Sequence, residues 1–202
     1  MIFAAGSGGN PERHLPLLAY LADQSFTVIA PHFDRLVSPT PTEDELLSRA
    51  RRLRIAIDYI TQKNLPVVGI GHSIGATLLT AIAGAQMWMG PGQRVPISTD
   101  ERLKRLVLFT PPTGFFKAPG ALDGVSIPIQ VWAGTKDAIT PPSQAEFLES
   151  AIENSSVELH VVEGAGHFSF LNTLPPQVAD PLADRETFLK SLAVEVSSFA
   201  GK

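Results

Sequence analysis

The chain of 202 residues contains no cysteine. This absence excludes a disulfide framework, thiolate zinc sites and a cysteine nucleophile. An excess of positive charge is also missing, because the formal net charge is −4. We therefore expect neither nucleic acid nor a membrane surface as a partner. No apolar run approaches the ~20 residues of a bilayer span, and residues 1–5 have no basic region typical of a signal peptide. We expect a cytoplasmic protein.

The length and the composition predict one globular domain over residues 1–202, since 44% of the residues are hydrophobic. Short apolar runs alternate with helical patterns along the chain. Their nearly continuous apolar character is typical of parallel strands that are covered on both faces. The sequence therefore predicts an α/β fold. The predicted strands are residues 2–5, 26–30, 67–70, 106–109, 129–133 and 157–162, and the predicted helices are residues 11–23, 42–62, 74–88, 142–152 and 182–199.

Two segments allow more than one interpretation. The helix over residues 42–62 begins with a capping-box spacing, Thr42 ahead of Glu45. Its four arginines lie mostly off the apolar stripe, so we interpret them as a solvated helix face rather than an anion site; they are Arg49, Arg51, Arg52 and Arg54. Residues 90–100 form the longest irregular piece, and we expect either a short lid or a surface loop there.

The strongest local motif is Gly-His-Ser-Ile-Gly at residues 71–75, which fits the Gly-x-Ser-x-Gly pattern between a strand and a helix. A serine on such a sharp turn has strained backbone geometry, and the residues two before and two after it crowd together, which favours glycine. An ordinary strand–helix turn with a hydroxyl cap is the alternative. A dinucleotide-binding pattern is excluded, because Ile74 occupies the position of its third glycine.

A serine nucleophile needs a base and an orienting acid. His167 lies in a glycine-framed loop just after the last predicted strand, and Asp137 follows the strand at residues 129–133. Both positions are at the carboxyl end of the sheet, where open α/β folds bind ligands. The order Ser73, Asp137, His167 is that of a hydrolase triad. Asp34 and Asp123 are the reserve acids.

The other four histidines are less well placed for catalysis. His14 lies in a predicted surface helix, and His160 lies within a strand. His32 follows a strand and could line the edge of the site. His72 precedes the candidate nucleophile, but the turn should direct its side chain elsewhere.

An oxyanion hole requires two backbone donors. We expect one to be the N–H of Ile74, directly after the serine. The other should come from the glycine-rich loop at residues 5–9, with Ser7 as the first choice and Gly8 in reserve. The alternative is an ordinary glycine-rich turn between a strand and a helix.

The glycine loop, residues 71–75, residues 132–141 and the run Gly-Ala-Gly-His-Phe-Ser-Phe-Leu at 164–171 resemble α/β-hydrolases, and more narrowly the bacterial serine hydrolases called predicted dienelactone hydrolases. The resemblance implies about six mostly parallel strands with helices on both faces, residues 26–30 at one edge, and the usual leading β-hairpin missing. It also implies a Ser73–His167–Asp137 site without a cofactor. Two residues depart from the pattern: Ala5 where a histidine is frequent, and Ser73 where dienelactone hydrolases have cysteine.

We therefore expect a serine hydrolase that cleaves a small or short-chain carboxylic ester through an acyl-enzyme on Ser73. The same residues could instead support a thioesterase, acyltransferase, perhydrolase or lyase, and a non-catalytic binding scaffold is the alternative of a different class. We expect a monomer or homodimer acting on a small molecule. The candidate substrate-binding residues share apolar side chains and are Met87, Trp88, Phe115, Phe116, Ile139 and Phe168.

Overall fold

The protein, described by a computed structural model over residues 1–38, 40–60 and 66–202, is built around a five-stranded sheet with the order β1-β2-β5-β6-β7. Every pair of neighbouring strands in this sheet is parallel. The α/β class predicted from the sequence is confirmed. The strands are β1 (Ile2–Ala4), β2 (Val67–His72), β5 (Leu103–Phe109), β6 (Ile129–Gly134) and β7 (Val157–Val162).

The predicted strand over residues 26–30 does lie at one edge of the sheet, but it pairs through a single parallel bridge between Ile2 and Ile29. Phe3 N donates to the Ile29 carbonyl over 2.8 Å, and Ile29 N donates to the Met1 carbonyl over 3.0 Å. Pro31 follows directly and has no N–H to continue the ladder. The sheet thus has five strands and one bridged edge segment rather than six full strands.

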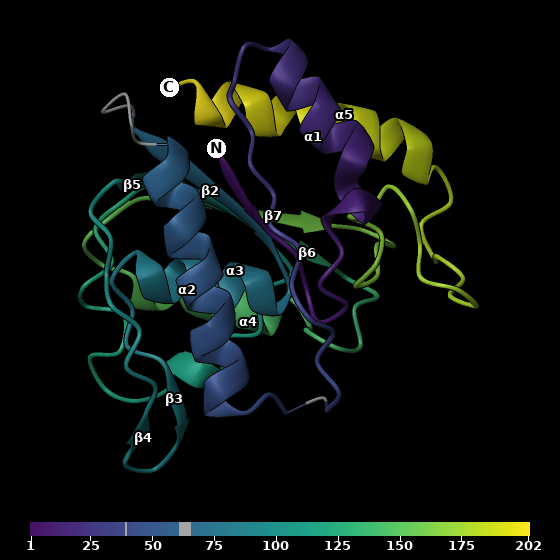
Figure 1. The fold of residues 1–202 in the computed structure, drawn as a ribbon. Helices are drawn as coiled ribbons and strands as arrows, with labels where there is room; N and C mark the ends of the chain where they lie inside the picture. Colours follow the sequence, from purple (N-terminus) through teal and green to yellow (C-terminus); the bar gives the residue numbers. More distant parts are fainter. Residues whose placement is uncertain (39, 61–65) are drawn as a thin grey trace.

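Helices cover both faces of the sheet, as the sequence predicts (Figure 1). Helices α1 and α5 contact each other on one face, and α2, α3 and α4 lie on the other. Strands β2 and β6 are buried along their whole length, which explains their continuous apolar sequence. The helices are η1 (Pro11–His14), α1 (Leu15–Asp23), α2 (Glu43–Ile60), α3 (Ile74–Ile82), η3 (Gly114–Phe116), α4 (Ser143–Ala151) and α5 (Arg185–Ala200).

Helix starts follow the local sequence. The predicted capping box forms at α2: Thr42 N donates to Glu45 Oε2 over 2.7 Å, and Glu45 N donates to Thr42 Oγ1 over 3.3 Å. At η1 the Asn10 side chain accepts from Glu12 N over 2.8 Å. The predicted continuation of α2 over residues 61 and 62 lies outside the described residues.

Helix α3 is shorter than the predicted helix over residues 74–88, because it ends at Ile82. Gly84 has φ +128, and a Cβ added there would lie 2.2 Å from the Gly124 carbonyl oxygen. The chain leaves the helix at this close approach and forms an antiparallel hairpin from β3 (Trp88–Gly90) and β4 (Gln93–Arg94). A residue without a side chain is needed at this exit, which ends the apolar helical pattern early.

Along the described residues, no helix is both long enough and apolar enough to cross a membrane.

Candidate active site

Ser73 lies on the turn between β2 and α3, with φ 54 and ψ −129. This conformation is unfavourable for a residue with a side chain. The turn is possible because the residues two before and two after Ser73 are glycines without side chains. A Cβ at Gly71 would lie 2.6 Å from the Ala76 backbone, and one at Gly75 would lie 2.1 Å from the Ala4 carbonyl oxygen. The two glycines therefore let α3 start directly beneath Ser73 and against the end of β1.

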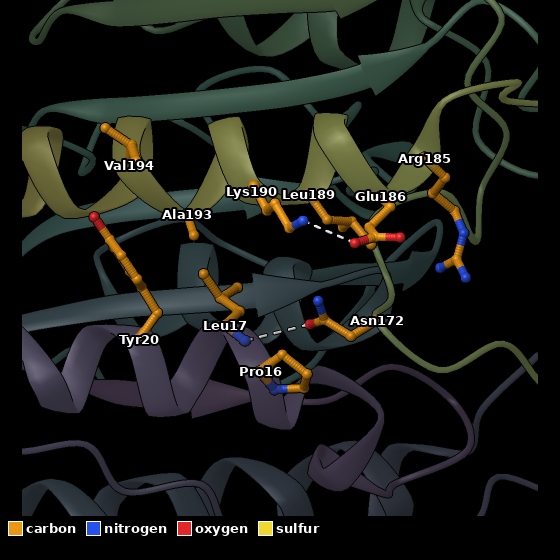
Figure 2. A pocket seen from close by; sticks show the side chains of 10 residues that line it. All are labelled: Pro16, Leu17, Tyr20, Asn172, Arg185, Glu186, Leu189, Lys190, Ala193 and Val194. Atoms are coloured by element: carbon orange, nitrogen blue, oxygen red, sulfur yellow. Dashed lines mark hydrogen bonds and ion pairs between the residues drawn. The ribbon is translucent and has the colours of Figure 1, made fainter.

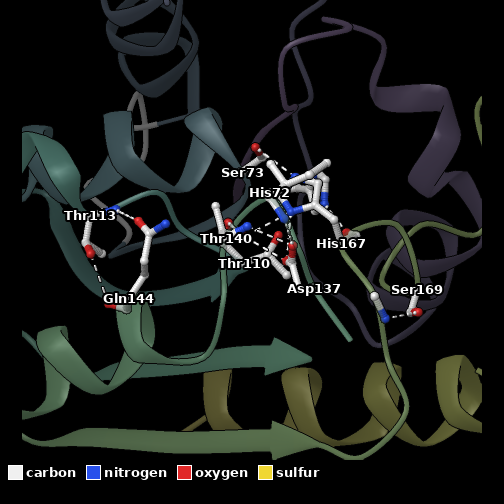
Figure 3. A network of polar contacts seen from close by, with 11 residues as sticks. His72, Ser73, Thr110, Thr113, Asp137, Thr140, Gln144, His167 and Ser169 are labelled. Carbon is white, nitrogen blue, oxygen red and sulfur yellow. Dashed lines mark hydrogen bonds and ion pairs between the residues drawn. The ribbon is translucent and has the colours of Figure 1, made fainter. Parts of the chain in front are cut away.

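Three residues from three strand ends meet here in one hydrogen-bonded run (Figure 3). Ser73 Oγ lies 3.1 Å from His167 Nε2, and His167 Nδ1 lies 2.8 Å from Asp137 Oδ2. All three residues are buried. With the imidazole proton on Nδ1, Nε2 is free to accept the hydroxyl proton of Ser73. The structure thus brings together the three residues that the sequence nominated.

The carboxylate of Asp137 is held by its own loop. Oδ1 accepts from Ile139 N over 2.8 Å and from Thr140 N over 2.7 Å, while Oδ2 accepts from Thr140 Oγ1 over 2.7 Å. Burial raises the pKa of this carboxyl, but the bonds and charge from His167 and the bonds from Thr140 outweigh burial, so the Asp137 pKa lies below its ordinary value. The side chain is an anion at neutral pH, as a partner for an imidazolium must be.

Two supporting side chains were not found by sequence reasoning. Thr140 Oγ1 lies 2.9 Å from His167 Nδ1 in addition to its bond to Asp137. His72 Nε2 donates to the His167 carbonyl over 3.0 Å, so its ring does turn away from Ser73 but holds the base's own backbone. Nothing local in the sequence signals the His72 contact, because it joins residues far apart in the chain.

The glycine-rich loop lies against the nucleophile. A Cβ added at Gly6 would lie 3.3 Å from Ser73 Cβ and 3.0 Å from His72 Nδ1. Within the described residues, neither the Ser7 N–H nor the Ile74 N–H donates to a protein acceptor. Both amides nominated for the oxyanion hole are therefore available to a ligand, and α3 directs the positive end of its dipole toward the same place.

The remaining histidines lie elsewhere. His14 is buried against Phe3 and His72, with ring centroids 4.6 and 5.4 Å apart, so the prediction of a surface position is wrong. His32 is exposed near Glu12. His160 stacks on Trp132 at 4.1 Å.

The reserve acids have other surroundings. Asp34 pairs with Arg52 at 2.7 Å, and Asp123 is exposed. Asp137 is the carboxylate that contacts His167.

The six candidate substrate-binding residues are scattered. Phe168 lies edge-on to His167 with ring centroids 5.2 Å apart, and Ile139 beside Asp137 is 58% exposed. Met87 and Phe116 are buried in the core and Phe115 packs against it. Trp88 lines a cavity of about 380 Å³ between the β3–β4 hairpin and η3, whose lining includes neither Ser73 nor His167.

A larger cavity of about 620 Å³ lies between α1 and α5 (Figure 2). Its walls include Leu17 and Tyr20 from α1 and Leu189 and Ala193 from α5, but no residue of the Ser73 network. Size alone does not make a reaction site, so we assign the candidate chemistry to the hydrogen-bonded Ser73 region and not to this groove.

The buried histidines predict an acid-sensitive fold. Burial, aided by Arg13, lowers the pKa of His14 to about 3, so the native state stays unprotonated between about pH 6.5 and 3 while the unfolded chain binds a proton. Stability from this group is therefore complete above pH 6.5 and falls below it, by about 2 kcal/mol at pH 5. Burial also lowers the pKa of His72 well below its ordinary range, which acts in the same direction.

Urea unfolding of the parent and His14→Leu at pH 7.5 and 5.0 measures this effect. The pH 7.5 difference reports the packing cost, and the parent should lose about 2 kcal/mol more than the variant on going to pH 5.0. Equal losses in both proteins would contradict the prediction.

Neither a protein-family model nor a curated protein sequence matches the chain. Solved structures do. An α/β serine hydrolase homologue from Coxiella burnetii is similar with a TM-score of 0.67 and 20% identity, over 96% of this chain and 82% of that chain. A Bacillus cereus carboxylesterase is similar with a TM-score of 0.60 and 21% identity, over 96% of this chain and 86% of that chain. An esterase from Thermogutta terrifontis is similar with a TM-score of 0.64 and 17% identity, over 98% of this chain and 78% of that chain.

At these identities the likeness shows the architecture, and the narrower resemblance to dienelactone hydrolases stays a prediction. The strand order, the helix layers and the solved structures agree: this chain has the α/β-hydrolase fold.

Proposed function

We propose that the protein is a serine hydrolase that cleaves a small or short-chain carboxylic ester through an acyl-enzyme on Ser73. The observation that carries this proposal is the continuous run from Ser73 Oγ to His167 Nε2, at 3.1 Å, and from His167 Nδ1 to Asp137 Oδ2, at 2.8 Å. A binding scaffold needs none of these three groups. Two of the proteins with similar structures, the carboxylesterase and the esterase, are named for the same activity.

The geometry allows the following sequence of steps. His167 Nε2 takes the proton of Ser73 as Oγ bonds to the ester carbonyl carbon, and the carbonyl electron pair moves to the oxygen, toward the amides of Ser7 and Ile74. Collapse of the tetrahedral intermediate breaks the ester C–O bond, and the leaving alcohol takes the proton from His167. Water then gives a proton to His167 and attacks the acyl-enzyme, which releases the acid and returns the proton to Ser73. Asp137 stabilises the imidazolium in both halves.

Narrow access supports a small acyl group. Ser73 is 8% exposed and His167 7% exposed, so little of either side chain is open to a substrate, which favours a small opening. Phe168 and Ile139 are the apolar side chains that we propose to contact the acyl chain, because they adjoin His167 and Asp137.

Fluorophosphonate labelling, followed by p-nitrophenyl esters of increasing acyl length, tests the proposal. We expect the protein to react at Ser73 and kcat/KM to fall beyond short acyl chains. No labelling at neutral pH would favour the scaffold. Labelling with faster turnover of thioesters, or acyl transfer to an added alcohol, would favour the other acyl chemistries. A flat response across acyl lengths would contradict the small opening.

A further inference from the structure

A buried arginine of α2 holds the glycine loop beside Ser73. Arg49 is 3% exposed, and its guanidinium binds backbone carbonyls of two loops. Nη1 donates to the Gly6 carbonyl over 2.8 Å, and Nη2 donates to the Ser7 carbonyl over 3.0 Å and to the Asp34 carbonyl over 2.6 Å. The sequence-based interpretation of this residue as part of a solvated face is therefore wrong, whereas Arg51 and Arg52 are indeed exposed.

The charge on Arg49 is held mainly by backbone carbonyls. Among the described residues no carboxylate forms an ion pair with it, and the guanidinium instead lies 5.1 Å over the Phe33 ring. Burial lowers the pKa of Arg49 to about 10, so the group remains charged at neutral pH. Burying a charge is costly, and the three carbonyl bonds, together with the nearby charges of Glu45 and Asp34, compensate that cost here.

Peptide geometry links these carbonyls to the site. In a planar trans peptide, the C=O of one residue and the N–H of the next point in opposite directions. Because the Gly6 carbonyl points at Arg49, the Ser7 N–H must point away from it; the Ser7 carbonyl fixes the Gly8 N–H in the same way. Both amides that the sequence nominated as donors from this loop thus belong to peptides that Arg49 holds.

Other contacts support this orientation. The Gly6 carbonyl also accepts from Gly9 N over 3.0 Å, and the Ser7 carbonyl also accepts from Leu36 N over 2.9 Å. The same stretch contacts the nucleophile, since a Cβ at Gly6 would lie 3.3 Å from Ser73 Cβ. A cationic donor on the Gly6 carbonyl also polarises that peptide, which makes the Ser7 N–H a better donor.

We propose that Arg49 is a positioning residue that orients the Gly6–Ser7 peptide, so that the Ser7 N–H meets the negative oxygen formed when Ser73 attacks a carbonyl. This inference rests on the proposed function of Ser73. Arg49 acts through the loop and does not contact the reacting atoms. The loop cannot use residue 5 for this purpose, because Ala5 has no polar side chain.

The test compares Arg49→Met and Arg49→Lys with Arg51→Met, an exposed arginine of the same helix. Arg49→Met should lower kcat about 10- to 100-fold with KM changed less than threefold, because the donor matters most in the transition state. The affinity for a short alkylboronic acid, whose adduct on Ser73 carries a tetrahedral oxygen, should fall by the same factor. Arg49→Lys keeps the charge without the planar fork, so its kcat should lie between those of Arg49→Met and the parent. Arg51→Met should match the parent.

Folding is followed by circular dichroism, and if Arg49→Met does not fold, the comparison rests on Arg49→Lys. An unchanged kcat in the folded variant, or a lower kcat with unchanged boronate affinity, would overturn the role of Arg49 while the proposed function stands. Failure of the proposed function has a different signature, since the parent itself would then neither hydrolyse esters nor label at Ser73, and the inference would fall with it.

Discussion

Replacing Ser73 with alanine is expected to lower kcat for ester hydrolysis by about 10⁶-fold and to abolish fluorophosphonate labelling. The acyl-enzyme route needs the hydroxyl that lies 3.1 Å from His167 Nε2. Without it, His167 and the loop amides could assist only a direct attack by water. The side chain is small and the turn keeps a Cβ, so the fold should be unaffected.

Initial rates with a short p-nitrophenyl ester, together with mass spectrometry of the labelled protein, measure this effect. Ser191→Ala is a matched control, because Ser191 is exposed on α5. It should retain full activity and labelling. A Ser73→Ala protein that keeps more than about 1% of parental kcat would show that another group is the nucleophile.

Asp137→Asn is expected to lower kcat by about 10⁴-fold. The carboxylate accepts a hydrogen bond from the His167 Nδ1–H over 2.8 Å, which leaves Nε2 free as a base. An amide at this position can donate to Nδ1 instead, and the ring then carries its proton on Nε2, where it cannot accept from Ser73. Fluorophosphonate labelling should slow in parallel, since the same base activates the hydroxyl.

The reserve carboxylate Asp123 provides the control. Asp123 is exposed, so Asp123→Asn should retain parental kcat. Thermal unfolding of both variants separates loss of the fold from loss of the base. If Asp137→Asn remained active while Asp123→Asn lost activity, the acid would have to be assigned to Asp123.

Local patterns predicted much of the fold. The α/β class follows from short apolar runs between amphipathic segments, and the Thr42–Glu45 capping box formed as its spacing predicts. Predicted boundaries were less accurate where contacts distant in sequence decide them. Helix α3 ends at Ile82 because Gly84 packs against the Gly124 backbone. The apolar pattern of the helix does not predict that contact.

At the candidate site, too, local patterns predict some features and miss others. Five consecutive residues predict the Ser73 turn, because a Cβ at Gly71 or Gly75 would lie only 2.6 or 2.1 Å from backbone atoms. Asp137 and His167 are predicted as site residues because each follows a strand, and parallel strands bring their carboxyl ends to one edge of the sheet. Thr140 and His72 also bind His167, and no local pattern in the sequence predicts those two contacts.

The sequence by itself determined the alternation of strands and helices and the pattern of the serine turn, because hydrophobic periodicity and glycine spacing are set by residues close together in the chain. Only the tertiary structure decided which polar groups are buried. Arg49 lies three residues after Leu46 and four before Leu53, within the buried stripe of α2, yet an arginine at that spacing stays buried only where carbonyls converge on it. Those carbonyls come from Gly6, Ser7 and Asp34, and folding alone brings them to the helix.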